Sequence, residues 1–255
     1  MDYAIVSVPA AAIRKKPDHR KEMTNQLLFG EAVKVLKIKK GKWAKVKSLH
    51  DGYEGWVTMS LLQETDEETA ATRSAHITAD IFTPLRSGQV SLLVPFGSSL
   101  PAYTENQTRI NQQVYQVEGN VLNRTTIQAG AVSLDQLVQP WLNAPYLWGG
   151  RTAMGVDCSG FIQVLFKTLG IDLPRDAWQQ AQEGEPVAAL HLGRTGDLVF
   201  FDDKEEIVHV GLLLKPELVV HAAGKVRIDP IDKKGIINRD SGQRTHRLKA
   251  IRRYW

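Results

Sequence analysis

The strongest constraint on this 255-residue chain is residues 145–161, Pro-Tyr-Leu-Trp-Gly-Gly-Arg-Thr-Ala-Met-Gly-Val-Asp-Cys-Ser-Gly-Phe. This segment contains Cys158, the only cysteine of the chain, and an apolar helical pattern follows it and ends at Gly170. We therefore expect Cys158 at a helix N-terminus, where the helix dipole and the unpaired N–H groups favour the nucleophilic thiolate. The alternative is a small buried side chain without a chemical role, because free cysteine is commonly buried.

Composition limits the class of protein. A single cysteine rules out an internal disulfide, so the fold does not depend on an oxidising compartment. The length allows two domains or three small ones. Asp2 and Tyr3 follow Met1 where a signal peptide would have basic residues, and no long apolar segment follows. This pattern indicates no signal peptide and no membrane span, and it favours the cytoplasm. A chain whose signal peptide had been removed would look the same and would be periplasmic or secreted.

The net charge of +4 is unevenly distributed, because residues 1–63 hold 12 Lys and Arg against 6 Asp and Glu. Many of these lysines alternate with apolar residues between Lys34 and Lys47, which is typical of the solvated face of a half-buried strand. A nucleic acid or another anionic polymer is the alternative partner for such a patch. Since no aromatic platform or recognition helix accompanies the lysines, we expect no nucleic-acid partner.

Strand and turn patterns divide the chain into three predicted domains, 1–63, 64–128 and 129–255. In the first domain, short strands separated by glycine turns indicate a small all-β barrel. Its predicted strands are 33–38, 43–47 and 53–57. Residues 63–74 are polar and acidic without periodicity, and we interpret them as a linker.

The other two domains differ in pattern. The second has weaker β signals and is interpreted as a diverged barrel or an isolated β insertion; its predicted strands are 76–78, 90–94, 99–103 and 114–119. In the third, a capping box of Ser133 and Gln136 begins a helix that Pro140 shortens. Later helices begin near Cys158 and Asp176, and the predicted strands that follow are 196–201, 207–214 and 218–222. Helices followed by antiparallel strands indicate an α+β domain.

Two histidines, His209 and His221, lie inside consecutive apolar strands, where histidine is unusual. A hairpin turning at 215–217 would bring the two imidazoles together, so that His209 faces Cys158 as its base and His221 fixes the tautomer. The other five histidines lie in polar or turn-like surroundings and are expected at the surface: His19, His50, His76, His191 and His246.

Cys158, His209 and His221 are also plausible zinc ligands. However, no second cysteine and no closely spaced histidine pair accompanies them. We therefore expect no metal site, and nothing in the sequence calls for another cofactor.

The motifs of residues 131–253 resemble those of the NlpC/P60 cysteine peptidases. They are Tyr146-x-Trp-Gly-Gly, Asp157-Cys-Ser-Gly-Phe, Leu173-Pro-Arg, Gly196-Asp-Leu-Val-Phe, His209-Val-Gly and His221-Ala. Residues 11–62 resemble a bacterial SH3 domain through Gly30-Glu-x-Val, Trp43-x-x-Val and Gly55-Trp-Val. The whole chain is similar to the γ-D-glutamyl-L-diamino acid endopeptidases that trim cell-wall peptides during murein recycling. This resemblance implies two small all-β SH3-like barrels followed by an α+β papain-like catalytic domain.

The resemblance also implies roles for individual residues. Cys158 would be the nucleophile, His209 the general base and His221 the orienting residue. Tyr146 would help the Cys158 N–H to hold the oxyanion. Further residues that would line the substrate pocket are Trp148, Asp157 and Ser159.

The implied substrate is a murein peptide, L-Ala-γ-D-Glu followed by diaminopimelate or lysine. Its free L-Ala ammonium needs carboxylates, because an unpaired buried charge is costly. Asp176 matches the family residue for this role, although Asp176 also suits a helix N-cap. Tyr53 and Glu22 would complete the pocket, which makes the first domain a cap that limits substrate length. Ala177 stands where many relatives have a serine that meets the D-Glu carboxylate.

Two other functions fit the same sequence. One is a cell-wall-binding protein without catalytic activity, which the basic residues 14–47 motivate. The other is an acyltransferase or amidase that uses the same scaffold. A wall-sedimentation assay and product analysis, respectively, would distinguish these from a peptidase.

Overall fold

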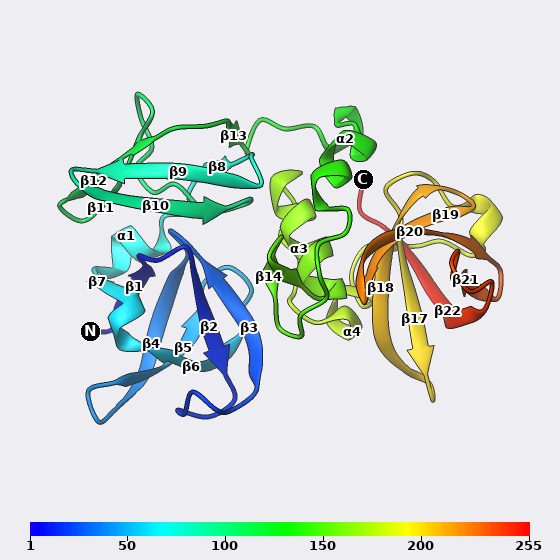
Figure 1. Cartoon of the computed structure of the whole chain (residues 1–255), viewed down its shortest axis with the longest axis horizontal. Coiled ribbons are helices and arrows are strands. Elements are labelled where there is room, and N and C mark those ends of the chain that lie inside the picture. The colour runs from blue at the N-terminus through cyan, green and yellow to red at the C-terminus, as the bar shows by residue number, and fades with distance from the viewer.

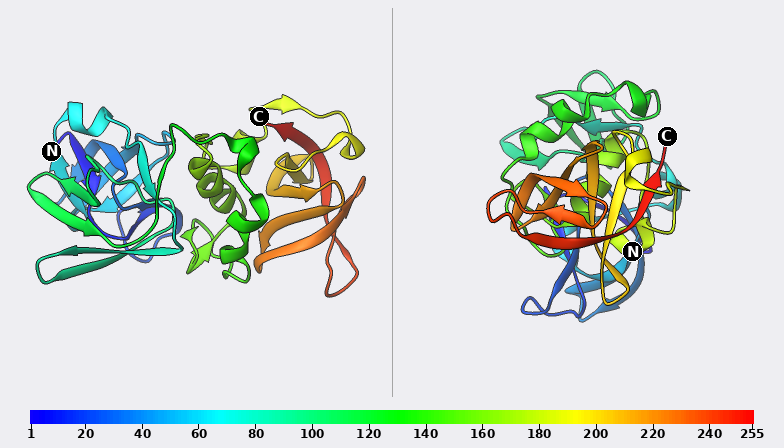
Figure 2. Two further views of the ribbon diagram at one scale, coloured as in Figure 1. Left: turned by 90° about the horizontal axis from the view of Figure 1, so that it is seen from above. Right: turned by 90° about the vertical axis from the view of Figure 1, so that its right-hand side faces the viewer.

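The computed structural model describes all 255 residues and is mostly β, with short helices (Figure 1). Two β units built from the N-terminal half lie beside each other, and a β barrel lies at the opposite end. Helix α3 (Cys158–Thr168) runs between them, as both Figure 1 and the left view of Figure 2 show. None of the helices combines the length and the apolar character that crossing a membrane requires.

The first unit is a seven-stranded sheet with the order β3-β2-β6-β5-β4-β1-β7. Its strands are β1 (Tyr3–Val6), β2 (Ala10–Arg14), β3 (Met23–Leu28), β4 (Ala32–Lys39), β5 (Trp43–Ser48), β6 (Glu54–Thr58) and β7 (Leu62–Thr65), with a 3-10 turn, η1 (Met59–Leu61), before the last. The three predicted strands correspond to β4, β5 and β6. Alternate side chains such as Val33, Val46 and Val57 point into the core, which explains the pattern of lysines between them.

The prediction of a linker at 63–74 is wrong. Strand β7 pairs with β1, and helix α1 (Glu67–Ala71) follows it directly. Asp66 caps this helix by accepting a 2.7 Å hydrogen bond from the Thr69 N–H. The acidic residues that suggested a linker therefore belong to an edge strand and to the first turn of a capped helix, where the dipole favours them.

The second unit contains a four-stranded sheet, β10-β9-β12-β11, and a separate strand pair, β13-β8. The strands are β8 (His76–Thr78), β9 (Phe82–Ser87), β10 (Val90–Pro95), β11 (Gln107–Ile110), β12 (Gln113–Val117) and β13 (Val121–Asn123). The predicted strand at 99–103 is wrong, because Ser99 makes only an isolated bridge to Ile77 before the chain turns. Ile5 and Phe29 of the first unit pack into this second core, so the two units share buried contacts.

The helical layer follows the second unit. It contains α2 (Leu134–Val138), α3 and α4 (Ala177–Gln180), with 3-10 turns η2 (Ala129–Ala131), η3 (Gln139–Trp141) and η4 (Leu190–Leu192) and the short strands β14 (Arg151–Thr152) and β15 (Gly155–Val156). Ser133 caps α2 and Pro140 lies in η3, as the pattern predicts. Every residue of α3 is buried, because one face packs on the N-terminal units and the other on the barrel.

The C-terminal sheet closes into a barrel. Its order is β16-β22-β17-β18-β19-β20-β21, and β21 also pairs with β22. The strands are β16 (Glu185–Pro186), β17 (Leu198–Asp203), β18 (Glu206–Lys215), β19 (Leu218–Ala223), β20 (Lys225–Asp232), β21 (Gly235–Ile237) and β22 (Arg244–Arg253). The sequence predicts β17, β18 and β19 but not the last three strands. Arginines and lysines interrupt the apolar pattern of β20 and β22, and β21 has only three residues.

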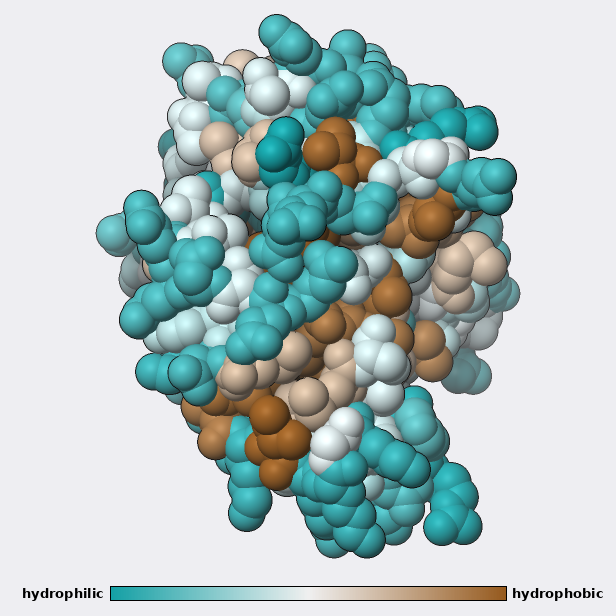
Figure 3. Space-filling model, turned by 90° about the vertical axis from the view of Figure 1, so that its left-hand side faces the viewer, coloured by the Kyte–Doolittle hydropathy of each residue, from teal (hydrophilic) through white to brown (hydrophobic).

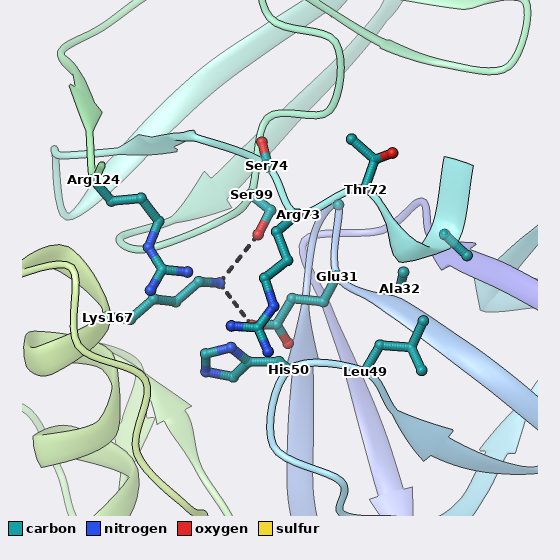
Figure 4. A pocket seen from close by; sticks show the side chains of 12 residues that line it. Glu31, Ala32, Leu49, His50, Thr72, Arg73, Ser74, Ser99, Arg124 and Lys167 are labelled. Carbon is teal, nitrogen blue, oxygen red and sulfur yellow. Dashed lines mark hydrogen bonds and ion pairs between the residues drawn. The ribbon is translucent and has the colours of Figure 1, made fainter. Parts of the chain in front are cut away.

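A buried carboxylate joins the three parts of the chain. Glu31 of the first unit accepts hydrogen bonds from Arg151 at 2.8 and 2.9 Å and from Lys167 of α3 at 2.8 Å. Lys167 also donates to Ser99 Oγ of the second unit at 3.1 Å. Figure 4 shows Lys167 reaching between Ser99 and Glu31. This network fixes the first unit against the helical layer.

The outer face of the two N-terminal units is mostly hydrophilic, with a broken diagonal band of hydrophobic residues across it (Figure 3). Large apolar side chains of these units that remain about half exposed are Leu36, Ile38, Val90 and Leu93. Lys37 and Lys39 of β4 are exposed between such residues. The basic stretch of the first unit is thus a solvent-facing strand.

Candidate active site

The N-terminus of α3 is built by the residues around Cys158. Asp157 is the N-cap, and its Oδ1 accepts a 2.7 Å hydrogen bond from the Gly160 N–H. Its Oδ2 accepts a 2.8 Å hydrogen bond from the Gly149 N–H, which ties the preceding glycine turn to the helix. A Cβ on Gly160 would lie 2.3 Å from the Gly150 carbonyl oxygen, so only glycine fits there. Cys158 is therefore the first residue of α3, as predicted.

Arg175 stabilises the N-terminal turn of α3 through hydrogen bonds to Asp157 and Ser159. Its guanidinium donates to both carboxylate oxygens of Asp157 at 3.0 and 2.6 Å and to Ser159 Oγ at 2.8 Å. It also donates to Asn25 Oδ1 of β3 at 2.7 Å, so the first unit helps to position the helix. Asp157 and Ser159 lie at the site as expected, and their side chains are engaged by this buried arginine.

Burial controls the charge state of Cys158. The thiol is 6% exposed, and burial raises the pKa of Cys158 to about 12, with the negative charge of Asp157 adding to the rise. The nearby Val210 N–H, Arg175 and the Ser159 N–H favour the thiolate and act in the opposite direction on the pKa of Cys158. The expected stabilisation of a thiolate by the helix N-terminus is therefore outweighed by desolvation in the free protein.

The two histidines meet on a hairpin as predicted. His209 on β18 and His221 on β19 are joined by a 2.9 Å hydrogen bond between His209 Nε2 and His221 Nδ1. His221 lies opposite Gly211, and a Cβ at Gly211 would be 3.2 Å from the His221 Cβ. A side chain at Gly211 would also meet Val219 Cγ2 at 2.5 Å, so this glycine allows β18 and β19 to approach closely. Both rings are buried, and burial lowers the pKa of His209 well below its ordinary value.

A carboxylate that the sequence did not predict extends the hydrogen bond between the two histidines. Asp229 on β20 is 3.0 Å from His221 Nε2 through its Oδ2. Arg227 donates to the same carboxylate at 2.6 and 2.9 Å, and the Arg239 N–H donates at 3.0 Å. Burial opposes ionisation of Asp229, but these hydrogen bonds together hold its pKa below the ordinary value.

The expectation that His246 is a surface residue is wrong. Closure of the barrel places β22 beside β21, and the His246 ring stacks on His209 with centroids 4.3 Å apart and planes 25° apart. Burial lowers the pKa of His246 to about 4. Nitrogens of His209, His221 and His246 lie within 4.8 Å of one another. Both nitrogens of His221 already have partners, His209 Nε2 and Asp229 Oδ2, and His246 Nδ1 faces Thr245 Oγ1.

His50 is also not a surface residue. Its side chain is 9% exposed at the junction between the first unit and the helical layer, 3.4 Å from Asp172. Burial lowers the pKa of His50 to about 4. It belongs to the junction drawn in Figure 4 rather than to the catalytic site.

Tyr146 lies close to the thiol. Its backbone N–H donates to the carbonyl of Gly224, between β19 and β20, and its half-buried side chain carries no hydrogen bond on the hydroxyl. Burial, followed by the negative charges of Cys158 and Asp157, raises the pKa of Tyr146. The hydroxyl is therefore protonated at neutral pH and free to donate.

A cavity of about 740 Å³ lies between the first unit and the helical layer, and Cys158 lines it. Predicted substrate residues line the same cavity from both sides: Glu22, Tyr53, Trp148, Asp157, Ser159 and Asp176. The structure thus brings together in one cleft all the predicted residues that resemblance assigns to substrate binding.

The carboxylates of this cavity differ in environment. Asp176 is the N-cap residue of α4, and burial raises the pKa of its half-buried carboxyl. Tyr53 is close enough for Asp176 to contribute to the raised pKa of its hydroxyl, after burial. Glu22 is more exposed, and it accepts a 3.0 Å hydrogen bond from the Trp148 indole and pairs with Lys15 at 3.6 Å. The Glu22–Trp148 contact crosses the cleft.

Comparison with known proteins agrees with this arrangement. The NlpC/P60 family matches residues 143–245, and the bacterial dipeptidyl-peptidase SH3 domain matches residues 13–62. Gamma-D-glutamyl-L-lysine dipeptidyl-peptidase of Bacillus subtilis is 30% identical over 77% of this chain and 71% of that protein. The chain belongs to the NlpC/P60 family. The protein of the same name from Bacillus cereus is 28% identical over 88% of this chain and 75% of that protein.

Solved structures support the fold of this NlpC/P60 peptidase. A structure of an NlpC/P60 family protein from Bacillus cereus covers 99% of both chains with a TM-score of 0.81 and 23% identity. An NlpC/P60 endopeptidase from Photobacterium damselae covers 98% of this chain and 70% of its own, with a TM-score of 0.69 and 18% identity. The chain therefore combines an SH3-like N-terminal domain with an NlpC/P60 catalytic domain.

The sequence did not predict three residues that contact the candidate site: Arg175, Asp229 and His246. Arg175 stands in the Leu-Pro-Arg motif, but its two carboxylate hydrogen bonds are visible only in three dimensions. Asp229 had only a weak sequence signal for a site residue: it is an acidic residue between Ile228 and Pro230, in a segment where polar and apolar residues alternate. His246 had none, because its neighbours in sequence are polar.

Proposed function

We propose that this NlpC/P60 chain is a cysteine endopeptidase that hydrolyses the bond between γ-D-Glu and the diamino acid of murein peptides with a free N-terminal L-Ala. The observation that carries the proposal is the shared cleft. The thiol of Cys158 and the carboxylate of Asp176 line one cavity, together with Tyr53 and Glu22 of the SH3-like domain. The names of the relatives, which specify γ-D-glutamyl-L-lysine dipeptidyl-peptidases, support the same bond.

The first half of the reaction is acylation. His209 Nδ1 removes the thiol proton as Cys158 Sγ attacks the γ-carbonyl carbon of D-Glu. The Cys158 N–H and the Tyr146 hydroxyl donate to the oxyanion that forms on the carbonyl oxygen. The C–N bond then breaks, and His209 returns its proton to the leaving amine of the diamino acid. The product that remains is a thioester between Sγ and L-Ala-γ-D-Glu.

The second half is hydrolysis of this thioester. A water molecule gives a proton to His209 and attacks the thioester carbonyl, which passes through the same oxyanion. The C–S bond breaks, the thiolate recovers the proton from His209, and the dipeptide leaves as a carboxylic acid. His221 keeps the His209 ring in the orientation that both halves need.

The cleft geometry accounts for the proposed selectivity. The ammonium of L-Ala would pair with Asp176, with Tyr53 and Glu22 beside it, and the SH3-like domain that lines this side of the cleft would leave no room for a residue before it. The SH3-like domain would then act as a cap and not as a wall anchor. Large cross-linked murein would be excluded, which suits recycling of free peptides in the cytoplasm without a membrane or nucleic-acid partner.

Finer features of the fold belong to the same proposal. We infer that residues 76–123 form a second, diverged SH3-like domain and that residues 129–255 form a papain-like α+β domain. The supporting observations are the antiparallel strand arrangement of the second unit and the position of the cysteine helix α3 against the barrel. Strand β7 (Leu62–Thr65) pairs with β1, so the first domain extends past the predicted boundary at residue 63, while the boundary between residues 128 and 129 remains our proposed division.

Product analysis tests the proposal. The purified chain is incubated with L-Ala-γ-D-Glu-diaminopimelate, and with the lysine analogue, and the products are identified by mass spectrometry. We expect the dipeptide L-Ala-γ-D-Glu and the free diamino acid, and no turnover by Cys158→Ala. Cleavage of another bond would favour the amidase or acyltransferase alternative, and unchanged turnover by Cys158→Ala would eliminate the mechanism.

A further inference from the structure

We propose that Asp229 is a positioning residue that sets the tautomers of both histidines, so that His209 presents an unprotonated Nδ1 to the Cys158 thiol. The inference deepens the proposed function and rests on it. It assigns a role to a strand, β20, that the motifs of the family resemblance do not include.

The assignment follows from donors and acceptors along the hydrogen-bonded chain. An ionised carboxylate can only accept, so the 3.0 Å contact with Asp229 Oδ2 requires the proton of His221 to be on Nε2. A neutral imidazole carries one N–H, which leaves His221 Nδ1 as an acceptor. At 2.9 Å, His209 Nε2 must then be the donor. The remaining nitrogen, His209 Nδ1, therefore has a free lone pair.

The surroundings of Asp229 hold it in the ionised form that this argument needs. The carboxylate is 1% exposed, and it receives two hydrogen bonds from Arg227 and one from the Arg239 N–H. Charge-assisted hydrogen bonds of this kind are stronger in a buried setting than in water. Asp229 thus has a fixed orientation with one oxygen, Oδ2, toward His221.

No other neighbour of His209 makes a hydrogen bond that would set its tautomer. His246 touches it through ring stacking, which fixes no proton, and the His246 Nδ1 faces Thr245 Oγ1 at 2.8 Å. Phe201 also packs on the ring and is apolar. The tautomer of His209 is therefore set through His221 alone, and through it by Asp229.

Asp229→Asn is the informative variant because it keeps the shape of the side chain. With its oxygen in the position of Oδ1, where it accepts from Arg227 Nη2 and the Arg239 N–H, the amide would place its NH2 in the position of Oδ2. That NH2 would present an N–H to His221, give up the hydrogen bond from Arg227 Nε and reverse both tautomers. His209 Nδ1 would then carry a proton and could not accept one from the thiol. We expect kcat to fall about 100-fold or more, with KM nearly unchanged.

The chain offers a matched control in Asp240→Asn. Asp240 pairs with the same Arg227 at 2.9 Å but is exposed and does not contact His221. Its loss should change kcat by less than about twofold, because it does not enter the donor and acceptor chain. A similar loss of kcat in both variants would show that Asp229 acts only by holding Arg227, and it would overturn the proposal.

Two further measurements do not depend on the identity of the substrate. Since Cys158 is the only cysteine, alkylation by iodoacetamide reports on this thiol alone. Asp229→Asn should alkylate more slowly than the wild type at neutral pH and equally fast at high pH, where hydroxide removes the thiol proton. In the wild type, nitrogen-15 NMR should find His221 and His209 both protonated on Nε2.

These results separate the two proposals. The positioning role is overturned if wild-type His221 carries its proton on Nδ1, or if Asp229→Asn alkylates like Asp240→Asn. If Asp229→Asn does not fold, the wild-type NMR result decides alone. If alkylation and NMR agree with the proposal while the murein peptide is not cleaved, the proposed substrate is wrong and the role of Asp229 stands.

Discussion

At the residue scale, the site without substrate contains a neutral Cys158 thiol and a neutral His209 imidazole. Burial raises the pKa of Cys158 to about 12 and lowers the pKa of His209 well below its ordinary value, so thiol and imidazole are both uncharged at neutral pH. In the proposed mechanism the proton therefore moves during the attack on the carbonyl, when the proposed oxyanion donors would stabilise the charge that forms. An unprotonated nitrogen on His209 is the condition for this transfer.

Asp176→Asn tests the proposed ammonium site. The amide keeps the size of the side chain and caps a helix as well as Asp does, so α4 should remain intact. Loss of the negative charge removes a charge-assisted contact, and kcat/KM for a peptide with a free L-Ala amine should fall about 10- to 100-fold. Steady-state kinetics on free and N-acetylated peptides would measure it.

The acetylated peptide is the control for that variant. It lacks the ammonium, so the wild type should cleave it poorly and the substitution should make little further difference. Equal losses on both peptides would contradict an ammonium-binding role and would leave Asp176 as a helix cap alone.

At the element scale, strong local patterns were predictable. The cysteine helix and the hairpin that carries both histidines were expected from runs of apolar residues with clear ends, such as Gly170 and the turn at 215–217. These elements are buried, so their sequence is apolar and periodic. The positions of Cys158, His209 and His221 follow from that periodicity.

Elements that depend on distant partners were not predictable. Strands β20 and β22 alternate apolar residues with arginine and lysine, and only closure of the barrel shows that Asp229 and His246 lie beside the hairpin. The edge strand β7 and helix α1 look like a linker because both are short and polar. Strand β7 is stabilised by pairing with β1, and helix α1 is stabilised by the Asp66 cap.

At the scale of the whole molecule, the cleft exists because the SH3-like domain is fixed to the catalytic domain. Glu31 is the centre of that attachment, through Arg151 and Lys167. Burial alone would raise the pKa of Glu31, but the two cations outweigh it and hold the pKa well below its ordinary value. The contribution of Glu31 to stability is therefore complete above the ordinary glutamate pKa and is lost as the pH falls toward the lowered value.

Glu31→Gln tests this attachment. The neutral amide leaves two buried cations without a counter-charge, so the free energy of unfolding should fall by about 3–5 kcal/mol. Denaturant unfolding followed by fluorescence would measure the loss. Glu54→Gln is the matched control, because Glu54 pairs with Lys45 at 2.8 Å on the surface and should matter far less. Similar losses in both variants would contradict a central role for Glu31.

The central claim is that Cys158 forms a thioester with the N-terminal dipeptide of a murein peptide. The most direct measurement is the intact mass of the chain after L-Ala-γ-D-Glu-diaminopimelate is added and the reaction is stopped within one turnover by acid. The account predicts a population heavier by one L-Ala-γ-D-Glu acyl group, with the added mass on Cys158 and absent from Cys158→Ala. Turnover of the peptide with no mass added to Cys158 at any time, or with the mass on another residue, would contradict it.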